Sequence, residues 1–229
     1  MIEVDALGER LSALRLCEGD ALAGMRRSLE EQGQLSALVL FSLTGELEII
    51  DGFKRVRAAR ALGWPTLAAH VVSVGTIDAK LRLRELHEGR GLTELEEGWL
   101  VRSLYREDHL TQSAIARLLS RHKTWVLRRL MLVESLEPSV QSDVRLGLIA
   151  PRAAVALSRL PRGNQQAASV VVGRRGLTVR QTEQLVAELM HEADPVARDA
   201  LLARRLDGAS PGNPPDHVGF VSQETSQTG

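Results

Sequence analysis

The chain has 229 residues, of which 44% are hydrophobic and 3% aromatic, so leucine, valine and alanine must fill its core. Its 29 basic and 29 acidic residues cancel, which excludes a protein that binds nucleic acid over its whole surface and restricts such contact to a local patch. A single cysteine, Cys17, excludes an internal disulfide and a multi-cysteine zinc site, and it fits a reducing cytoplasm. The sequence shows neither a secretory signal nor an apolar stretch that could span a bilayer, so we expect no membrane association.

The first third of the chain mixes strand and helix signals. Two apolar runs, 38–43 and 47–50, flank the turn signal Thr44-Gly45 and predict a β-hairpin. An amphipathic segment that stops at Gly33 predicts a helix before this hairpin. The expected elements are, in order, a weak strand at 11–16, a helix at 21–32, the two hairpin strands, a helix at 51–62 and a strand at 67–74.

From residue 77 onward the strand signals disappear, and prolines and glycines separate a series of helical segments. The last stretch is rich in Gly, Pro, Ser, Thr and Gln, so we expect it to be disordered. The predicted helices span 79–88, 95–105, a pair within 110–132, 139–146, 150–160, 164–172, 178–191 and 195–206. The expected fold class is α+β, with a mixed α/β domain at 1–76, connecting helices at 77–109, an all-α domain at 110–206 and a disordered tail at 207–229.

Residues 110–132, LTQSAIARLLSRHKTWVLRRLML, read as a helix-turn-helix. Thr111 is a natural N-cap, and residues 120–122 form a short break in which Ser120 stands where many such units have glycine. Two apolar sets at helical spacing predict the buried faces of the two helices. These sets are Ile115, Leu118 and Leu119 in the first helix and Val126, Leu127 and Leu130 in the second.

The opposite face of this helix pair is basic, because residues 112–133 contain no acidic side chain. A basic surface of this kind suits a DNA backbone, since each phosphate contact releases condensed counterions. The start of the second helix is the end that usually meets base edges. The alternative is an ordinary helical hairpin with a solvated basic face. The candidate DNA-binding residues are Thr111, Gln112, Arg121, His122, Lys123, Thr124, Trp125, Arg128 and Arg129.

A second stretch with chemical content is IIDGFKRVRAARALGW, residues 49–64. In it a strand ends, Gly52 allows close backbone approach, and a helix begins whose free N–H groups favour an anion. Lys54, Arg55 and Arg57 crowd the first turns of that helix and predict a phosphate site. The alternative is a surface helix with solvated basic residues.

Together these segments resemble the ParB/KorB-type family of partition proteins over residues 10–190, in the same order. The resemblance also includes LIAPRAAVALSRLP and LTVRQTEQLV, which are similar to helical segments that follow the family's helix-turn-helix. DGFKRVRAARALGW resembles the family's Gly-Glu-Arg-Arg-x-Arg-Ala phosphate box. Its matching residues are Gly52, Arg55, Arg57 and Ala58, while Lys54 replaces an arginine and Phe53 replaces the glutamate.

The resemblance implies an N-terminal domain on the ParB/sulfiredoxin fold that binds CTP with Mg²⁺, hydrolyses it slowly and lets a dimer close around DNA. The family's second phosphate box, Glu-Asn-x-x-Arg, corresponds here to Glu-Leu-His-Glu-Gly at 85–89, which retains Glu85 but lacks the amide and the guanidinium. Arg90 follows one residue later. We therefore expect weakened triphosphate binding and at most a weak CTPase. The candidate nucleotide-phosphate residues are Gly52, Lys54, Arg55, Arg57 and Glu85, and no catalytic or metal-ligating residue is assigned.

Three functions remain open. The first is a duplex DNA-binding protein of partition, transcription or mobile-element control, located in the cytoplasm on a nucleoid or plasmid. The second is an enzyme on the ParB/sulfiredoxin fold, a CTPase or nuclease, although Cys17 lies far from the phosphate box in sequence. The third is a protein-interaction adaptor, favoured by the bulky Trp125 at a base-reading position. Because the predicted helices stop near Leu206, a homodimer is expected to form through the N-terminal or helical region.

Overall fold

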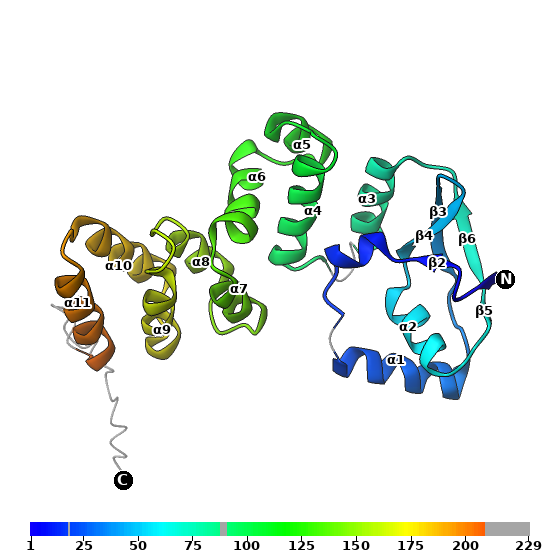
Figure 1. The fold of residues 1–229 in the computed structure, drawn as a ribbon, viewed down its shortest axis with the longest axis horizontal. Coiled ribbons are helices and arrows are strands. Elements are labelled where there is room, and N and C mark those ends of the chain that lie inside the picture. Colours follow the sequence, from blue (N-terminus) through cyan, green and yellow to red (C-terminus); the bar gives the residue numbers. More distant parts are fainter. Residues whose placement is uncertain (18, 88–90, 209–229) are drawn as a thin grey trace, which may run out of the picture.

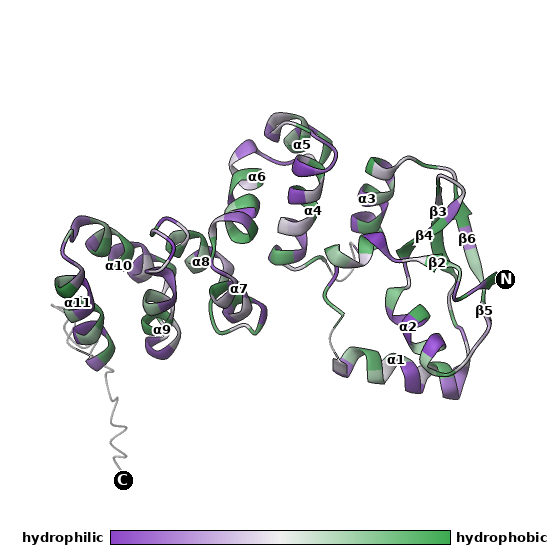
Figure 2. Ribbon diagram, viewed as in Figure 1, coloured by the Kyte–Doolittle hydropathy of each residue, from purple (hydrophilic) through white to green (hydrophobic). Residues whose placement is uncertain are grey.

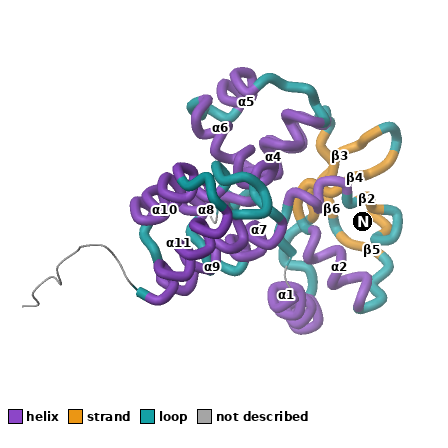
Figure 3. Tube along the Cα trace, turned by 60° about the vertical axis from the view of Figure 1, so that its left-hand side comes forward, coloured by secondary structure: helices purple, strands orange, loops and turns teal. Residues whose placement is uncertain are grey.

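The computed structural model describes residues 1–17, 19–87 and 91–208 (Figure 1). A small α/β unit lies at one end of an elongated molecule, and the helices follow one another toward α11 at the other end (Figure 1). Figure 3 shows that the described strands are confined to the N-terminal end. The predicted α+β class is therefore confirmed. The tail predicted to be disordered lies, from residue 209 onward, outside the described residues.

The strands are β1 (Ile2–Glu3), β2 (Leu7–Gly8), β3 (Leu38–Leu43), β4 (Glu46–Asp51), β5 (Thr66–Leu67) and β6 (Ala69–Val72). The helices of the α/β unit are η1 (Arg10–Leu14), α1 (Gly19–Gln32), α2 (Phe53–Ala61) and α3 (Thr76–Glu85). The helices that follow are α4 (Glu94–Arg106), α5 (Gln112–Leu118), α6 (Lys123–Leu130), η2 (Met131–Ser135), α7 (Pro138–Arg145), α8 (Pro151–Leu157), α9 (Gln165–Arg175), α10 (Val179–His191) and α11 (Pro195–Asp207).

The larger sheet has the strand order β2-β4-β3-β6. The predicted hairpin is confirmed, because β3 and β4 pair antiparallel around Thr44 and Gly45, which both have positive φ angles. The strands β2 and β6 pair in parallel with β4 and β3. The sheet is thus mixed, and it brings the end of β4 and the start of α2 to one edge of the α/β unit.

Two predicted strands in this unit need correction. Residues 11–16 do not form a strand but contain most of the 3₁₀ helix η1, because burial of Leu11 and Leu14 requires a spacing of three residues. The predicted strand at 67–74 is divided into β5, which pairs with β1, and β6, which pairs with β3. The division falls at Ala68, whose backbone N–H and C=O both bond to the side-chain amide of Gln34 at 2.7 and 2.8 Å.

Two cores fill the described part of the chain. The first joins the sheet, α1 to α3 and the inner faces of α4 to α6, and the second lies among the helices from α7 to α10. Helix α4 contributes Leu100, Val101 and Leu104 to the first core and Leu95 to the second. Figure 2 shows polar and apolar residues alternating around most helices, as expected for elements that bury one face. In the described residues, no helix is long and apolar enough to cross a membrane.

Helix α4 packs closely against the end of α6 and the π-helical turn η2 that follows it. Gly98 makes this approach possible, because a Cβ there would lie 2.8 Å from Val133 and 3.0 Å from the carbonyl oxygen of Arg129. A capping box between Thr93 and Glu96 fixes where α4 begins. The first turn of α4 is therefore held firmly between the α/β unit and the helix-turn-helix.

Candidate nucleic-acid interface and nucleotide site

The predicted helix-turn-helix is formed by α5 and α6. Thr111 caps α5 as predicted, with its hydroxyl accepting a bond of 3.2 Å from the N–H of Ala114. Ile115, Leu119, Val126 and Leu130 are buried between the helices and the first core, as predicted. The prediction was wrong for two leucines: Leu118 is 39% and Leu127 is 45% exposed. Each short helix packs on only one side, so its buried stripe is narrower than the apolar pattern suggested.

Ser120 in the turn adopts a left-handed conformation with φ of 52°, which glycine tolerates better than other residues. We expect Ser120→Gly to raise the free energy of unfolding by up to about 1 kcal/mol, because the unfavourable conformation is relieved. Urea denaturation measures this effect. Ser113→Gly, on the exposed face of α5, is the matched control and should instead lower the free energy of unfolding by about 0.5 kcal/mol. Destabilisation by Ser120→Gly would contradict the expectation.

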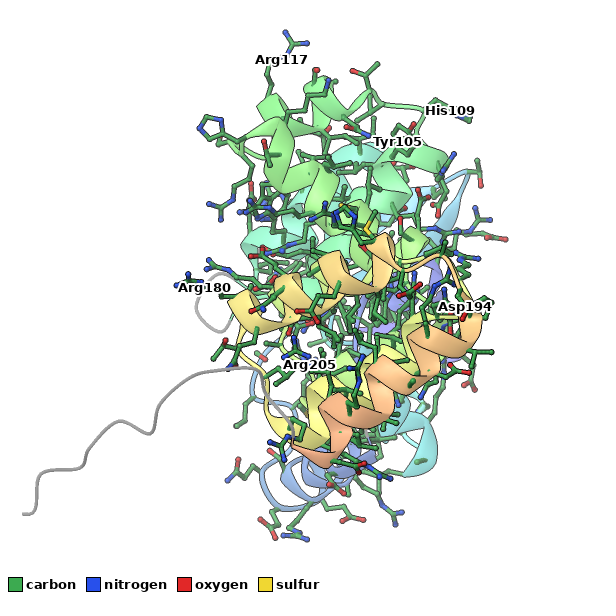
Figure 4. The ribbon with its side chains drawn as sticks, turned by 90° about the vertical axis from the view of Figure 1, so that its left-hand side faces the viewer. Tyr105, His109, Arg117, Arg180, Asp194 and Arg205 are labelled. Carbon is green, nitrogen blue, oxygen red and sulfur yellow. The ribbon has the colours of Figure 1, made fainter. Side chains whose placement is uncertain are left out.

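The start of α6 presents an exposed, cationic surface. Arg121, His122, Lys123 and Thr124 are exposed, and Arg128 follows on the next turn and is also exposed. Figure 4 shows Arg117 of α5 projecting outward at the top of the view. Among the residues that the structure describes, Arg117, Arg121, Lys123 and Arg128 take part in no salt bridge. These cations are thus available to an anionic partner, while Gln112 is half-buried near the N-cap Thr111.

Arg129, predicted to bind DNA, is instead engaged within the protein. Its side chain is 11% exposed and lies between two carboxylates of α4. Its Nε and Nη2 bond to Glu97 at 2.8 and 2.7 Å, and its Nη1 donates to Glu94 at 2.6 Å. Its guanidinium also lies 5.0 Å from the centre of the Trp125 ring. Arg129 therefore holds α6 against α4 and has little surface left for a ligand.

Sequence reasoning missed two further arginines near this surface. A groove of about 450 Å³ lies between α6, α8 and the start of α10. It brings Arg128 together with Arg152 and Arg159, which are exposed and seven residues apart. That spacing is two helical turns, so both lie on one face of the α8 region. The signal in the sequence was this spacing, but only the packing of α8 beside α6 shows that the basic surface extends beyond the helix-turn-helix.

A cavity of about 430 Å³ lies where β4 ends and α2 begins. Its wall includes Gly52, Lys54 and Arg55, three of the candidate nucleotide-phosphate residues. Gly52 is the N-cap of α2 with φ of 110°, and it makes no side-chain bond to the first N–H groups of the helix. Those groups therefore remain free of a cap and can face an anion. A Cβ at Gly52 would also lie 2.4 Å from Leu38, so glycine is needed for packing as well.

Two of the predicted phosphate-binding arginines are already paired. The guanidinium of Arg55 donates to the carbonyl oxygens of Ser36 and Ala37 at 2.6 and 2.8 Å and bonds to Asp51 at 2.5 Å. Arg57 does not line this cavity but lines a neighbouring pocket that shares Arg15 and Cys17 with it, and it pairs with Glu9 at 2.8 Å. Glu85 is exposed at the end of α3 and is not part of the cavity wall.

The segment before α1 supplies cavity residues that the phosphate-box pattern did not reveal. Arg15 and Cys17 line the cavity together with Lys54. Cys17 is therefore close to the phosphate box in space although it is far from it in sequence. Glu96, from the start of α4, closes another side and accepts a bond of 2.9 Å from the N–H of Leu16. Glu96 also lies 3.2 Å from Arg15. The short distances arise because α4 packs against η1, which no local pattern predicts.

The charges around the cavity are largely balanced internally. Arg15 faces Glu96, Arg55 faces Asp51, and His87 lies 3.5 Å from Asp51. Lys54 lines the cavity and forms no salt bridge with a described residue. Within the described ranges, no cluster of three His, Cys, Asp or Glu side chains could hold a metal ion. Residues 88 and 89 of the predicted second phosphate box, and Arg90 after it, lie outside the described residues.

Comparison with known proteins identifies the family. Residues 1–85 match the family model of the ParB N-terminal domain, and residues 90–191 match that of the ParB HTH domain. The two matches follow one another along the chain and together cover most of it. The chain belongs to the ParB family.

Two relatives illustrate the similarity in sequence. The nucleoid occlusion protein of Halalkalibacterium halodurans is 25% identical over 185 residues, which are 80% of this chain and 65% of that protein. The probable chromosome-partitioning protein ParB of Pseudomonas putida is 31% identical over 180 residues, 77% of this chain and 62% of that protein. The matched part of the chain thus spans less than two thirds of the length of either relative.

C-terminally truncated ParB from Caulobacter crescentus has been solved in two complexes. The complex with the centromeric parS site has 22% sequence identity and a TM-score of 0.49, and it covers 81% of this chain and 97% of that chain. The complex with CTP-gamma-S has 21% identity and a TM-score of 0.36, and it covers 76% of this chain and 95% of that chain.

Proposed function

We propose that this chain is a DNA-binding partition protein that binds duplex DNA through α5 and α6. The observation that carries the proposal is the exposed start of α6, where Arg121, Lys123 and Arg128 have no carboxylate partner among the described residues. Such cations suit phosphate contacts, and the start of the second helix suits base contacts. Thr111, Gln112, His122 and Thr124 complete the proposed contact surface, and Arg152 and Arg159 extend it along the groove.

A salt titration of duplex binding tests this function. We expect the logarithm of the binding constant to fall linearly with the logarithm of the salt concentration, because bound phosphates release counterions. A pool of random duplexes, from which bound sequences are selected, would give the preferred site. A homodimer formed through the N-terminal or helical region fits this function, since helix-turn-helix proteins commonly bind paired half-sites as dimers. Such a protein acts in the cytoplasm on a nucleoid or plasmid. Failure to retain any duplex at low salt would contradict the proposal.

We also propose that the cavity at the start of α2 takes CTP. Its support is the juxtaposition of uncapped N–H groups on α2 with Lys54, the one cation of the described wall that forms no salt bridge. CTP supplies a base, a sugar and three phosphates, and the phosphates would lie toward Lys54 and the helix start. Asp51 and Glu96 in the same wall repel a triphosphate, so affinity is expected to be modest. The coordination of Mg²⁺ would then come chiefly from the phosphates, since the described residues form no metal cluster.

Calorimetric titration tests the nucleotide site. Lys54→Ala is expected to weaken CTP binding about tenfold, because it removes the unpaired cation of the described wall. Arg57→Ala is the matched control and should change the affinity much less, since Arg57 is on the same helix but pairs with Glu9 and does not line the cavity. Equal affinities for CTP and ATP, or equal effects of the two substitutions, would contradict the assignment.

A further inference from the structure

Five side chains form a continuous row from the first turn of α4 to the turn of the helix-turn-helix. Glu94 and Glu97 hold the guanidinium of Arg129 through bonds of 2.6 to 2.8 Å. Arg129 lies 5.0 Å from the centre of the Trp125 ring, and Arg121 lies 5.5 Å from the same ring. The row therefore ends at an exposed arginine on the proposed DNA surface.

The base of this row is rigid. Arg129 is 11% exposed and Glu97 is 15% exposed, and both nitrogen edges of the guanidinium are occupied by carboxylates. A planar guanidinium bound on two edges can rotate little, and a ring that contacts it is fixed in turn. Gly98 in the next turn of α4 lies against the carbonyl of Arg129, so the backbones are also in close contact.

The geometry of α6 and the turn before it explains why the row reaches Arg121. Trp125 and Arg129 lie four residues apart in α6 and share one face of it, and Arg121, in the turn before the N-cap His122, reaches the same ring. An arginine at a helix start is long and samples many rotamers when nothing contacts it. Contact with an indole restricts that freedom, and the attraction between a guanidinium and the ring favours one orientation.

We propose that Glu94 and Glu97 are positioning residues for DNA binding: through Arg129 and Trp125 they hold Arg121 in the orientation that meets the duplex. This inference rests on the proposed DNA-binding function and goes beyond it, because it assigns a role to two acidic residues outside the helix-turn-helix. It also explains a tryptophan at a base-reading position as a support for its neighbour.

The proposal and simple electrostatics predict opposite signs for one experiment. Replacing Glu94 and Glu97 by glutamine removes two negative charges next to an anionic ligand. If the carboxylates only contributed charge, duplex affinity would rise. If they position Arg121, affinity should fall about tenfold although the surface becomes more positive.

The variants and control are therefore E94Q/E97Q, Arg129→Lys and Glu183→Gln, each titrated with the same selected duplex. Arg129→Lys keeps the charge but loses the planar fork, so we expect a similar loss of affinity. Glu183 lines the same groove and is exposed, but it does not contact Arg129. Its replacement should leave affinity unchanged or raise it. A rise in affinity for E94Q/E97Q, or no change, would overturn the proposal.

A spectroscopic measurement separates this proposal from the proposed function. The chain has three tryptophans, so protein labelled with fluorotryptophan gives three ¹⁹F resonances, and Trp125→Phe identifies that of Trp125. In the absence of DNA, E94Q/E97Q should shift the Trp125 resonance, whereas Glu183→Gln should not. An unshifted resonance overturns the row of contacts even where the duplex binds. A shifted resonance in a protein that binds no duplex at any salt concentration overturns the DNA-binding function and the role of the row in it.

Discussion

Replacing Arg121, Lys123 and Arg128 together by alanine is expected to lower duplex affinity about a hundredfold at moderate salt, because each cation contributes a phosphate or base contact. The three side chains are exposed and unpaired among the described residues, so their loss should leave the fold intact. Fluorescence anisotropy over a salt series measures the effect. The slope of the logarithmic salt plot should fall by roughly 3, one counterion contribution for each missing cation.

The control removes the same charge from another part of the molecule. Arg26 and Arg27 of α1 and Arg174 of α9 are exposed arginines that lie far from α6 in sequence and on other helices. Their triple alanine variant has the same net charge as the test variant. We expect it to lose much less affinity and to retain most of the slope. Equal losses in the two variants would mean that the chain attracts DNA through its overall field and not through α6.

Lys80→Ala is expected to lower the free energy of unfolding by about 3 kcal/mol, because it breaks a buried ion pair and leaves a carboxylate without its partner. The Lys80 side chain is only 2% exposed, and its ammonium lies 2.6 Å from Asp108 and 3.3 Å from Glu107. Both acids directly follow α4, so these ion pairs connect the end of α4 to α3 of the α/β unit. Urea denaturation gives the difference. Lys80→Ala combined with Asp108→Ala should recover part of the loss, since the buried carboxylate is then gone and the remaining partner, Glu107, is 67% exposed.

The pH dependence of this effect follows from Glu107. Partial burial raises the pKa of Glu107, but bonds from Ser103 and Lys80 outweigh it and hold the pKa below its ordinary value of 4.5. A carboxyl whose pKa is lower in the folded protein adds stability above the ordinary pKa and loses it as the pH falls through the folded value. The stability difference between the unmodified chain and Lys80→Ala should therefore shrink below pH 4.5. A difference that grows on acidification would contradict this account.

The sequence was sufficient to predict most helices and strands, because periodicity and capping are local properties. Thr111 caps a helix as its pattern predicted, and the runs that flank Thr44 and Gly45 pair as a hairpin. The local rule failed at 11–16, where Leu11 and Ala13 suggest alternation, but a 3₁₀ helix buries Leu11 and Leu14 and leaves Ala13 exposed. The predicted burial of Leu118 and Leu127 was wrong for a related reason, since an apolar pattern does not show how many neighbouring elements cover a helix.

The candidate sites were predicted less completely, because the use of an arginine depends on distant partners. Arginine is a residue type that binds phosphate, yet Arg55 is paired with Asp51 and Arg129 with Glu97. The sequence contains these acids but does not show which arginine they will meet. In the same way, only packing of α4 on η1 brings Arg15 to the cavity.

The placement of α4 has a consequence for how the molecule denatures. Its leucines enter both cores, its first turn bonds to Leu16 and Arg129, and its last turn meets Lys80. Unfolding of either core would therefore also remove contacts that α4 makes with the other core. An elongated chain with two cores would ordinarily melt in two stages, but here heat should produce a single cooperative transition with one calorimetric peak.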